Sequence, residues 1–400
     1  MSLTYVASVT PSSATLRAGC TDETNNQLIV VESTTPSLII YNMSTQAQVS
    51  RWGTSSAPSC VSLVAPGVAA IGYSGTSVID FMQLSTGFRL SAAAGTTTST
   101  VKGQLMAADL SLQVGFMTSS TARNYFKFDY GAGGVVTSYT NSAINASSQT
   151  NCIILKSTGR WLMGTTAGQV IEINAGGEVV DIADFGNVPN AGNLSVSTNT
   201  SNSINYLSYD NNLLLISWAQ GSLSLVDWST KEVIYTQPTG SSTNGTTLCA
   251  ASSGICISSR NYTTNTTSNV LFETDFTCGA PISSSLPLFT DSTSAILDAG
   301  INTTTARGWA LQSTPRIRFF DIVPRDSTTQ TFTVQPSGSH VPFRLLVLDR
   351  TGGVGTATRL LDTYAQSPGT YRLPTGKTLI VAVGYGDGAN ALYQGSQIAT

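Results

Sequence analysis

Residues 204–235 read INYLSYDNNLLLISWAQGSLSLVDWSTKEVIY. Four short apolar stretches occur in this segment, and turn residues separate them: Asp210 with Asn211, Gln220 with Gly221, and the run 229–231. Runs of Leu, Ile, Val and Tyr bounded by Asn, Gly, Asp and Ser are typical of β-strands joined by tight turns. The segment therefore predicts a four-stranded antiparallel sheet, with the apolar run 213–216 as an inner strand.

The same pattern recurs along the first 325 residues. Each copy has an apolar strand that ends in an amide or a carboxylate, then a turn, then another apolar strand. The copies are 38–42 (LIIYN), 79–83 (IDFMQ), 125–129 (YFKFD), 170–174 (VIEIN), 223–227 (LSLVD), 271–275 (LFETD) and 318–321 (RFFD). Their last residues, at 42, 83, 129, 174, 227, 275 and 321, lie about 46 residues apart on average. This is the spacing of four-stranded propeller blades.

A ring explains why such sheets are stable. One four-stranded sheet cannot bury both of its faces, whereas stacked copies bury each other and ring closure protects the edges. We predict an all-β fold with a seven-bladed β-propeller at residues 1–328, with six and eight blades as alternatives. In the second copy the expected strands are 62–64, 69–73, 77–83 and 88–90. The N-terminal strand 3–9 is expected to complete the last blade. A β-sandwich array or a parallel β-helix is the rival fold, but a β-helix needs a shorter repeat of roughly 20–25 residues.

The 46-residue spacing stops near residue 328, and residues 329–400 predict a small antiparallel β-sandwich. Its expected strands are 331–334, 343–349, 369–373 and 377–385, and basic residues gather there. The basic residues are Arg344, Arg350, Arg359, Arg372 and Lys377, against Asp349, Asp362 and Asp387.

A resemblance is carried by this C-terminal part. The run RLLVLDRTG at 344–352, the strand GTYRL at 369–373 and the segment from VAV at 381–383 to DGANA at 387–391 are similar to the carboxypeptidase-regulatory-like, or transthyretin-like, β-sandwich. That domain ends many tailed-bacteriophage virion proteins. Pro368 departs from the family, which has Asp-containing turn chemistry there. The turn at 226–230 (VDWST) is generic to YVTN- and WD-like blades.

Composition limits the partners. Charged residues are only 10% of the chain and the net charge is −3, so a field that binds nucleic acid is not expected. No signal peptide and no long apolar span are evident, so membrane insertion is not expected. None of the six cysteines forms a CxxC pair; we expect buried free thiols, with a Cys249–Cys256 bridge as the alternative.

The sequence offers little catalytic chemistry, so we predict no catalytic, cofactor-binding or metal-binding residues and no enzyme activity. The single histidine, His340, reads as a turn residue. The repeated acids Asp129, Asp227, Asp275 and Asp321 read as structural turn caps. Five arginines could face a central channel: Arg51, Arg123, Arg160, Arg260 and Arg307. The tryptophans are expected mainly in blade packing and less often in ligand stacking; they are Trp52, Trp161, Trp218, Trp228 and Trp309.

Three functions remain. The first is a structural protein of a tailed-phage virion, a tail or capsid appendage for host attachment or assembly. It would be made in the host cytoplasm, form a homo-oligomer (a trimer before other states), and have other virion proteins and a host-surface glycan or receptor as partners. The second is a cell-surface carbohydrate-binding or adhesion propeller, and the third is a propeller glycoside hydrolase.

Overall fold

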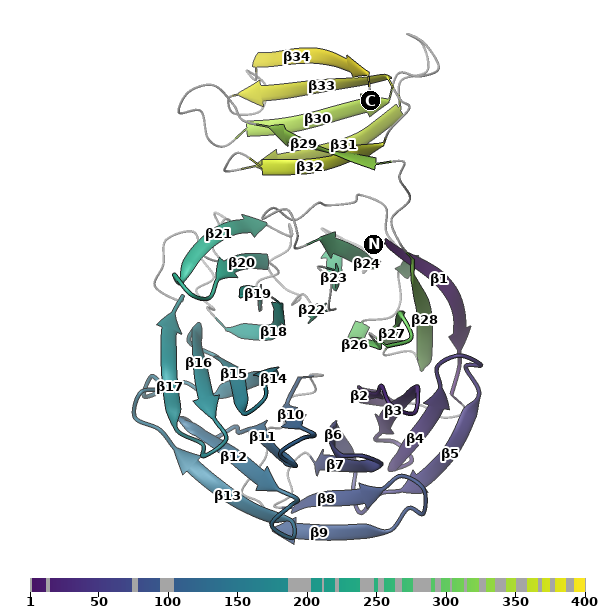
Figure 1. The fold of residues 1–400 in the computed structure, drawn as a ribbon, viewed down its shortest axis with the longest axis vertical. Helices are drawn as coiled ribbons and strands as arrows, with labels where there is room; N and C mark the ends of the chain where they lie inside the picture. Colours follow the sequence, from purple (N-terminus) through teal and green to yellow (C-terminus); the bar gives the residue numbers. More distant parts are fainter. Residues whose placement is uncertain are drawn as a thin grey trace.

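The computed structural model contains strands and no helices in the residues that it describes (Figure 1). These residues are 2–11, 15–73, 78–93, 104–185, 203–210, 212–219, 223–237 and, further on, mainly the strands between 248 and 399. Side chains are described in most of the strands up to β21 and in most of β26–β28, with some positions of β1, β9, β18, β20, β21, β26 and β28 left out, and they are not described in β22–β25 or β29–β34. His340 and the glycine run 352–355 lie outside the described residues.

Seven four-stranded sheets occupy residues 2–323, and consecutive strands are paired antiparallel. The first has β2 (Leu16–Asp22), β3 (Gln27–Glu32), β4 (Ser37–Asn42) and β5 (Gln48–Gly53). The second has β6 (Pro58–Ala65), β7 (Val68–Tyr73), β8 (Val78–Gln83) and β9 (Arg89–Ala93). The third has β10 (Met106–Asp109), β11 (Val114–Thr118), β12 (Asn124–Asp129) and β13 (Val135–Thr140). The fourth has β14 (Thr150–Ser157), β15 (Arg160–Thr165), β16 (Gln169–Asn174) and β17 (Val179–Asp184).

The remaining sheets complete the ring. The fifth has β18 (Ile204–Asp210), β19 (Leu213–Trp218), β20 (Leu223–Asp227) and β21 (Glu232–Gln237). The sixth, described by its strand pairing alone, has β22 (Leu248–Ala250), β23 (Ile255–Tyr262), β24 (Ser268–Asp275) and β25 (Phe289–Asp291). The last has β26 (Ile296–Asn302), β27 (Arg307–Gln312), β28 (Arg316–Val323) and β1 (Ser2–Val9). Six sheets are thus defined down to their side chains, and the fold is a β-propeller.

The first strand of each sheet lies nearest the centre of the ring (Figure 1). These innermost strands neighbour one another in chain order, and β26 returns to β2. The run 213–216 is buried as expected, but it belongs to β19, the second strand; β18 lies closer to the centre. The seven repeated motifs of the sequence all fall on third strands, from β4 to β28.

The hydrophobic cores lie between neighbouring sheets. One cluster joins Ile29 and Val31 of the first sheet to Val61 and Ile71 of the second, and four further clusters follow the same rule. The second and third strands are buried almost throughout, whereas the outermost strands β13 and β17 alternate between exposed and half-buried residues. The second strands are therefore covered on both faces, whereas the outermost strands keep one side open to solvent.

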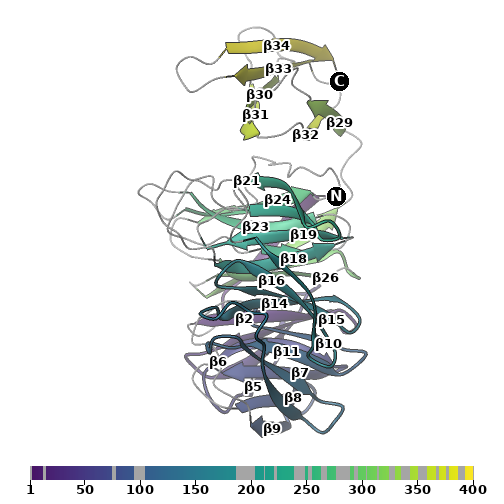
Figure 2. The same cartoon turned by 90° about the vertical axis from the view of Figure 1, so that its left-hand side faces the viewer.

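The N-terminal strand takes the outermost place in the last sheet. β1 pairs antiparallel with β28, and Ser2 lies opposite Val323. The ring of Tyr5 packs against Phe320 with centroids 6.1 Å apart. The ring is thus completed by the strand that the sequence assigned to this role (Figure 1). Figure 2 shows the ring edge-on.

Beyond the ring, residues 329–399 form six strands in two sheets (Figures 1 and 2). β29 (Thr329–Val334) pairs with β32 (Gly369–Pro374). The other sheet has the order β31 (Thr358–Ala365), β30 (Phe343–Asp349), β33 (Thr378–Tyr385) and β34 (Leu392–Ala399). Four of these strands were expected from the sequence, and β31 and β34 were not. The packing of the two sheets into a sandwich stays a prediction.

Candidate binding cleft

A cleft of about 490 Å³ opens between the first and second sheets. It is lined by the end of β2, the outermost strand β5, and the turns that follow β6 and β8. The volume lies within the roughly 300–1,000 Å³ that small-molecule sites occupy. Its polar lining residues are Asp22, Asn25, Gln27, Ser50, Gln83 and Ser85, and its larger apolar ones are Ile40, Val49, Trp52, Val68 and Leu84.

The indole of Trp52 is held in one orientation. Its Nε1–H donates a hydrogen bond to the carbonyl of Leu84 across the sheet boundary, at 2.9 Å. Gly87 stands directly against the ring, since a Cβ there would lie 2.5 Å from the nearest ring atom. Gly87 has a φ of +70°, which an L side chain rarely adopts, so a glycine is required on both counts. The side chain is thus fixed before any ligand arrives.

Two polar side chains that line the cleft have groups with no hydrogen-bond partner among the described residues. The Thr86 hydroxyl donates to Oε1 of Gln83, which leaves Nε2 of Gln83 without a partner among the described residues. The hydroxyl of Ser50 is buried and has no hydrogen-bond partner in the described part of the chain. A buried polar group without a partner is rare, because it loses its hydrogen bond to water on folding. These groups therefore offer donors and acceptors that the fold does not use.

The charge of the cleft is low. Asp22 is the one carboxylate among the described lining residues, and it already accepts hydrogen bonds from the backbone and the side-chain amide of Asn25, at 3.0 and 2.8 Å. Arg51 lies between Ser50 and Trp52 on β5, so it points to the opposite face of the strand. Its guanidinium pairs there with the buried Glu32 at 2.8 Å. No lysine or arginine is among the lining residues that the structure describes.

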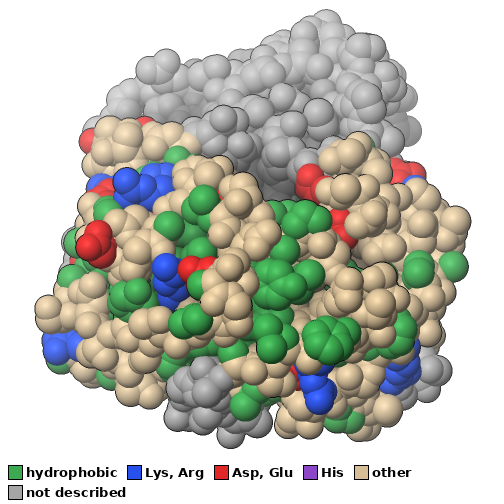
Figure 3. All heavy atoms as spheres, turned by 60° about the horizontal axis from the view of Figure 1, so that its bottom comes forward, with side chains coloured by type: hydrophobic (Ala, Val, Ile, Leu, Met, Phe, Trp, Pro, Cys, Tyr) green, Lys and Arg blue, Asp and Glu red, His purple; other side chains and the backbone are tan. Residues whose placement is uncertain are grey.

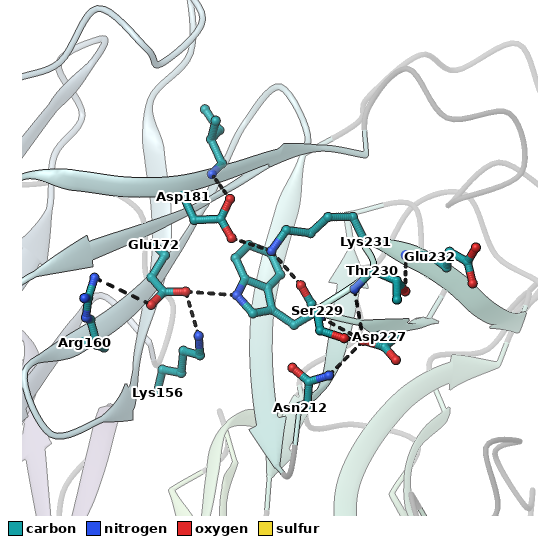
Figure 4. A network of polar contacts seen from close by, with 12 residues as sticks. Lys156, Arg160, Glu172, Asp181, Asn212, Asp227, Ser229, Thr230, Lys231 and Glu232 are labelled. Carbon is teal, nitrogen blue, oxygen red and sulfur yellow. Dashed lines mark hydrogen bonds and ion pairs between the residues drawn. The ribbon is translucent and has the colours of Figure 1, made fainter.

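A second polar cluster lies between the fourth and fifth sheets (Figure 4). The buried Glu172 accepts hydrogen bonds from Lys156 at 2.7 Å and from the indole of Trp228 at 2.9 Å. The ammonium of Lys231 lies over the Trp228 ring, 3.3 Å from its centroid, and pairs with Asp181 at 2.6 Å. Each charged group in this cluster has a partner from the protein itself. We therefore interpret it as a contact that joins two blades rather than as a site.

Two of the four repeated acids, Asp129 and Asp227, act as turn caps. Asp129 accepts the backbone N–H of Ala132, and Asp227 accepts those of Ser229 and Thr230. The hydrogen bonds from the Ser229 hydroxyl and the Thr230 amide lower the pKa of Asp227. Asp321 instead pairs with Arg307 at 2.6 Å, and the side chain of Asp275 lies outside the described residues.

The expected arginine channel is not found. Arg51, Arg160 and Arg307 pair with Glu32, Glu172 and Asp321 of their own sheets, and Arg123 donates to the carbonyl of Ile144. The four therefore lie in four different sheets and do not converge, because each satisfies a local carboxylate or carbonyl. The side chain of Arg260, on β23, is not described.

The tryptophans divide as the sequence suggested. Four are buried in the blade packing, and Trp52 is half-buried in the cleft; the buried ones are Trp161, Trp218, Trp228 and Trp309. Among the cysteines, Cys20, Cys60 and Cys152 are free. Burial raises the pKa of the Cys60 thiol to about 12, so it stays protonated and unreactive. On β22 and β23, Cys249 lies opposite Ile257 and Cys256 lies opposite Ala250.

The described residues hold no group of three or more His, Cys, Asp or Glu side chains that could bind a metal ion. In the same residues, no helix has the length and apolar character needed to cross a membrane. What the cleft can do chemically is bind: it presents an indole wall, amides and hydroxyls.

Sequence reasoning missed this cleft. Trp52 and Gly87 come from different repeats, and nothing in the local sequence of either shows that they meet. The signal available was the glycine in the turn after the second motif, Ser85 to Gly87, together with the tryptophan at the end of the preceding copy.

Comparisons with known proteins define the class of the molecule. No family model matches the sequence, and no curated protein matches it. Solved structures do match in fold. The Cps50 (Swd1) β-propeller domain of Myceliophteria thermophila superposes with a TM-score of 0.59 at 11% identity, over 80% of this chain and 100% of that domain. A chain of the Mitotic Checkpoint Complex gives a TM-score of 0.58 at 11% identity, over 80% and 92% of the two chains. These similarities show a WD-like β-propeller fold and carry nothing about function.

Proposed function

We propose that this protein is a non-enzymatic structural component of a tailed-phage virion, a tail or capsid appendage that takes part in host-surface attachment or particle assembly. We propose that the propeller has seven blades and that β22–β25 form one of them. The strands after residue 328 are proposed to pack as a small sandwich that joins the propeller to the particle, while the propeller faces outward.

The observation that carries the proposal is the cleft between the first two sheets. A fixed indole beside unused amides and hydroxyls suits recognition of a surface ligand. Glycoside hydrolysis normally needs two carboxyl groups at the scissile bond, and Asp22 alone lines this cleft in the described residues. Recognition without turnover is therefore favoured over a hydrolase.

The character of the surface agrees with this role. Figure 3 shows a face on which uncharged polar side chains and backbone surround hydrophobic side chains near the middle, with few basic and acidic side chains of both signs among them. A surface of this kind has no extended field of one sign, which argues against a nucleic-acid partner. The second candidate, a cell-surface carbohydrate-binding propeller, is favoured by the same cleft and differs in where the protein resides.

The test is the composition of the particle. Antibodies against the propeller should label purified virions in immunogold micrographs, and the protein should be found in the virion proteome. A protein shortened to residues 1–328 should fold but fail to enter particles, and it should lose its oligomeric mass in solution. Incorporation of the shortened protein at the normal level would contradict the joining role of residues 329–400.

A further inference from the structure

We infer that the cleft between the first two sheets binds a neutral saccharide, with Trp52 as the stacking wall. This inference rests on the proposed function, because it names the class of ligand for the same cleft. It depends on the shape, the charge and the unused hydrogen-bonding groups of the cleft.

The charge of the lining selects against anions. Among the described lining residues Asp22 is the one charged side chain, and Arg51 is turned away to Glu32. A sialylated, sulfated or phosphorylated ligand would place its negative charge near Asp22 with no cation to balance it. Burying an unpaired charge is costly, so the cleft favours an uncharged ligand.

The polar groups match a ligand with many hydroxyls. A side-chain amide donates and accepts in one plane, and a hydroxyl does both at one atom. The cleft supplies Gln83 and Gln27 as amides and Ser50 as an unpaired hydroxyl. A purely apolar ligand would leave these groups unsatisfied.

The apolar wall matches the other face of a sugar. The C–H groups on one face of a pyranose pack on an aromatic ring, and Trp has the largest such surface. The indole is already held by Leu84 and Gly87, so little side-chain entropy is lost when a ligand stacks on it. Val49, which is 55% exposed, extends this wall outward.

The chain contains a matched control position. Tyr139 on β13 packs against Gly177, which has a φ of +87°, just as Trp52 on β5 packs against Gly87. The Tyr139 hydroxyl donates to the carbonyl of Gly176, again across a sheet boundary. Tyr139 is not among the residues of the cleft. Removing either ring thus removes a similar contact between blades, but only Trp52 faces the cleft.

The experiment uses the full chain on an array of multivalent neutral and acidic glycans, followed by saturation-transfer NMR with the best neutral oligosaccharide. We expect binding to one or more neutral glycans. Trp52→Ala should weaken it at least tenfold, and Gln83→Ala, at an exposed position, should weaken it by a smaller factor. Tyr139→Ala should leave the affinity unchanged.

Thermal unfolding of the three variants separates loss of binding from loss of fold, and Trp52→Phe keeps a ring if Trp52→Ala does not fold. Unchanged binding by Trp52→Ala or Gln83→Ala would overturn the inference. A preference for acidic glycans, or no binding to any neutral glycan, would also overturn it. Particle entry separates the two claims. Normal entry of Trp52→Ala together with lost glycan binding would support both, whereas absence of the natural protein from particles would overturn the virion proposal and leave glycan binding by the cleft standing.

Discussion

At the end of the third strand in four sheets, the side-chain oxygen of an Asn or Asp accepts backbone N–H groups of the following turn. Asn42 accepts the backbone N–H groups of Ser44 and Thr45, and Asn174 accepts those of Gly176 and Glu178. Asn and Asp are short enough to reach their own backbone two or three residues on. The chain then passes through a residue with positive φ, which is Gln46, Gly87, Gly133 or Lys231 in four of the sheets. The repeated polar residue therefore stabilises the sharp turn that follows it.

Variants of Lys231 can measure how much this backbone conformation lowers the free energy of unfolding. Its φ is +63°, where glycine is normally preferred, and its ammonium binds Asp181 and the Trp228 ring. Lys231→Ala keeps the backbone strain and loses both contacts, whereas Lys231→Gly loses the contacts and relieves the strain. We expect Lys231→Gly to be more stable than Lys231→Ala by about 1 kcal/mol in urea unfolding. Equal stability of the two variants would show that the turn is not strained in solution.

Asp298 gives the ring a dependence on pH. It lies on β26, and one oxygen accepts the backbone N–H of Gly19 on β2 at 2.9 Å, across the boundary between the last and the first sheet. Its other oxygen accepts the N–H of Ala299. Burial raises the pKa of this carboxyl group from 3.8 to about 7, although both hydrogen bonds act to lower it. The native state therefore binds the proton more tightly than the unfolded chain.

The sign of the effect follows from linkage. The contribution of Asp298 to stability is fully present below pH 4 and is lost as the pH rises through 7. A shift of this size corresponds to a loss on the order of 4 kcal/mol. We expect Asp298→Asn, which cannot ionise, to gain in stability relative to the natural protein between pH 4 and pH 8. Urea unfolding at several pH values measures this difference. A constant difference across the range would contradict a raised pKa.

At the scale of elements, the order of strands in a sheet could be predicted from the sequence because it depends on local signals. Apolar runs, turn residues and the polar residue after each third strand all lie within one copy of the repeat. The strand β31 was missed because Arg359 and Asp362 interrupt its apolar run. The burial of Asp80 and its hydrogen bonds were also not predicted. This carboxylate accepts hydrogen bonds from Tyr73, Ser55 and Ser91, which lie in three different segments of the chain.

The candidate cleft could not be predicted from the sequence either, because its residues come from separate segments. Its wall on β5 and its floor near Gln83 and Leu84 belong to different repeats. Their contact depends on how one sheet stacks on the next, and the spacing of repeats does not determine this. The arginines do not converge because nearby carboxylates such as Glu32 and Asp321 bind them locally.

The strand β1 is the element on which the ring depends most. Removal of residues 2–9 would expose the edge of β28 and the ring of Phe320. An open edge strand loses its hydrogen bonds and is prone to pair with other chains. We expect the shortened protein to unfold at a temperature lower by more than about 5 °C and to aggregate. Differential scanning calorimetry and light scattering measure both effects.

The control for this deletion is Val6→Ser. Val6 is 37% exposed at an irregular point of the β1–β28 pairing, so its substitution keeps the strand and removes little buried surface. We expect this variant to behave like the natural protein. A deletion variant with an unchanged melting temperature would show that β1 does not close the ring in solution.

At the scale of the whole molecule, the closure of the ring before residue 329 sets the limits of an independent unit. β28 ends at Val323, and its outer edge is already paired with β1. We therefore expect residues 1–328 to fold alone, with the same far-ultraviolet circular dichroism per ring residue and one cooperative thermal transition. The contradicting result is a broad or multiphasic thermal transition of the 1–328 protein when the propeller of the full chain unfolds in a single transition.

The pairing of Ser2 with Val323 also constrains how the chain is made. During synthesis the first strand leaves the ribosome long before its partner exists, and it must wait unpaired while about 300 residues are added at roughly 5–20 residues per second. Contacts that close so long a loop carry a large entropic cost, so they form late in folding. A circular permutant that starts at Leu16 and places residues 2–9 after Val323 would make both partners together. This variant should refold faster than the natural order of strands while reaching the same final structure.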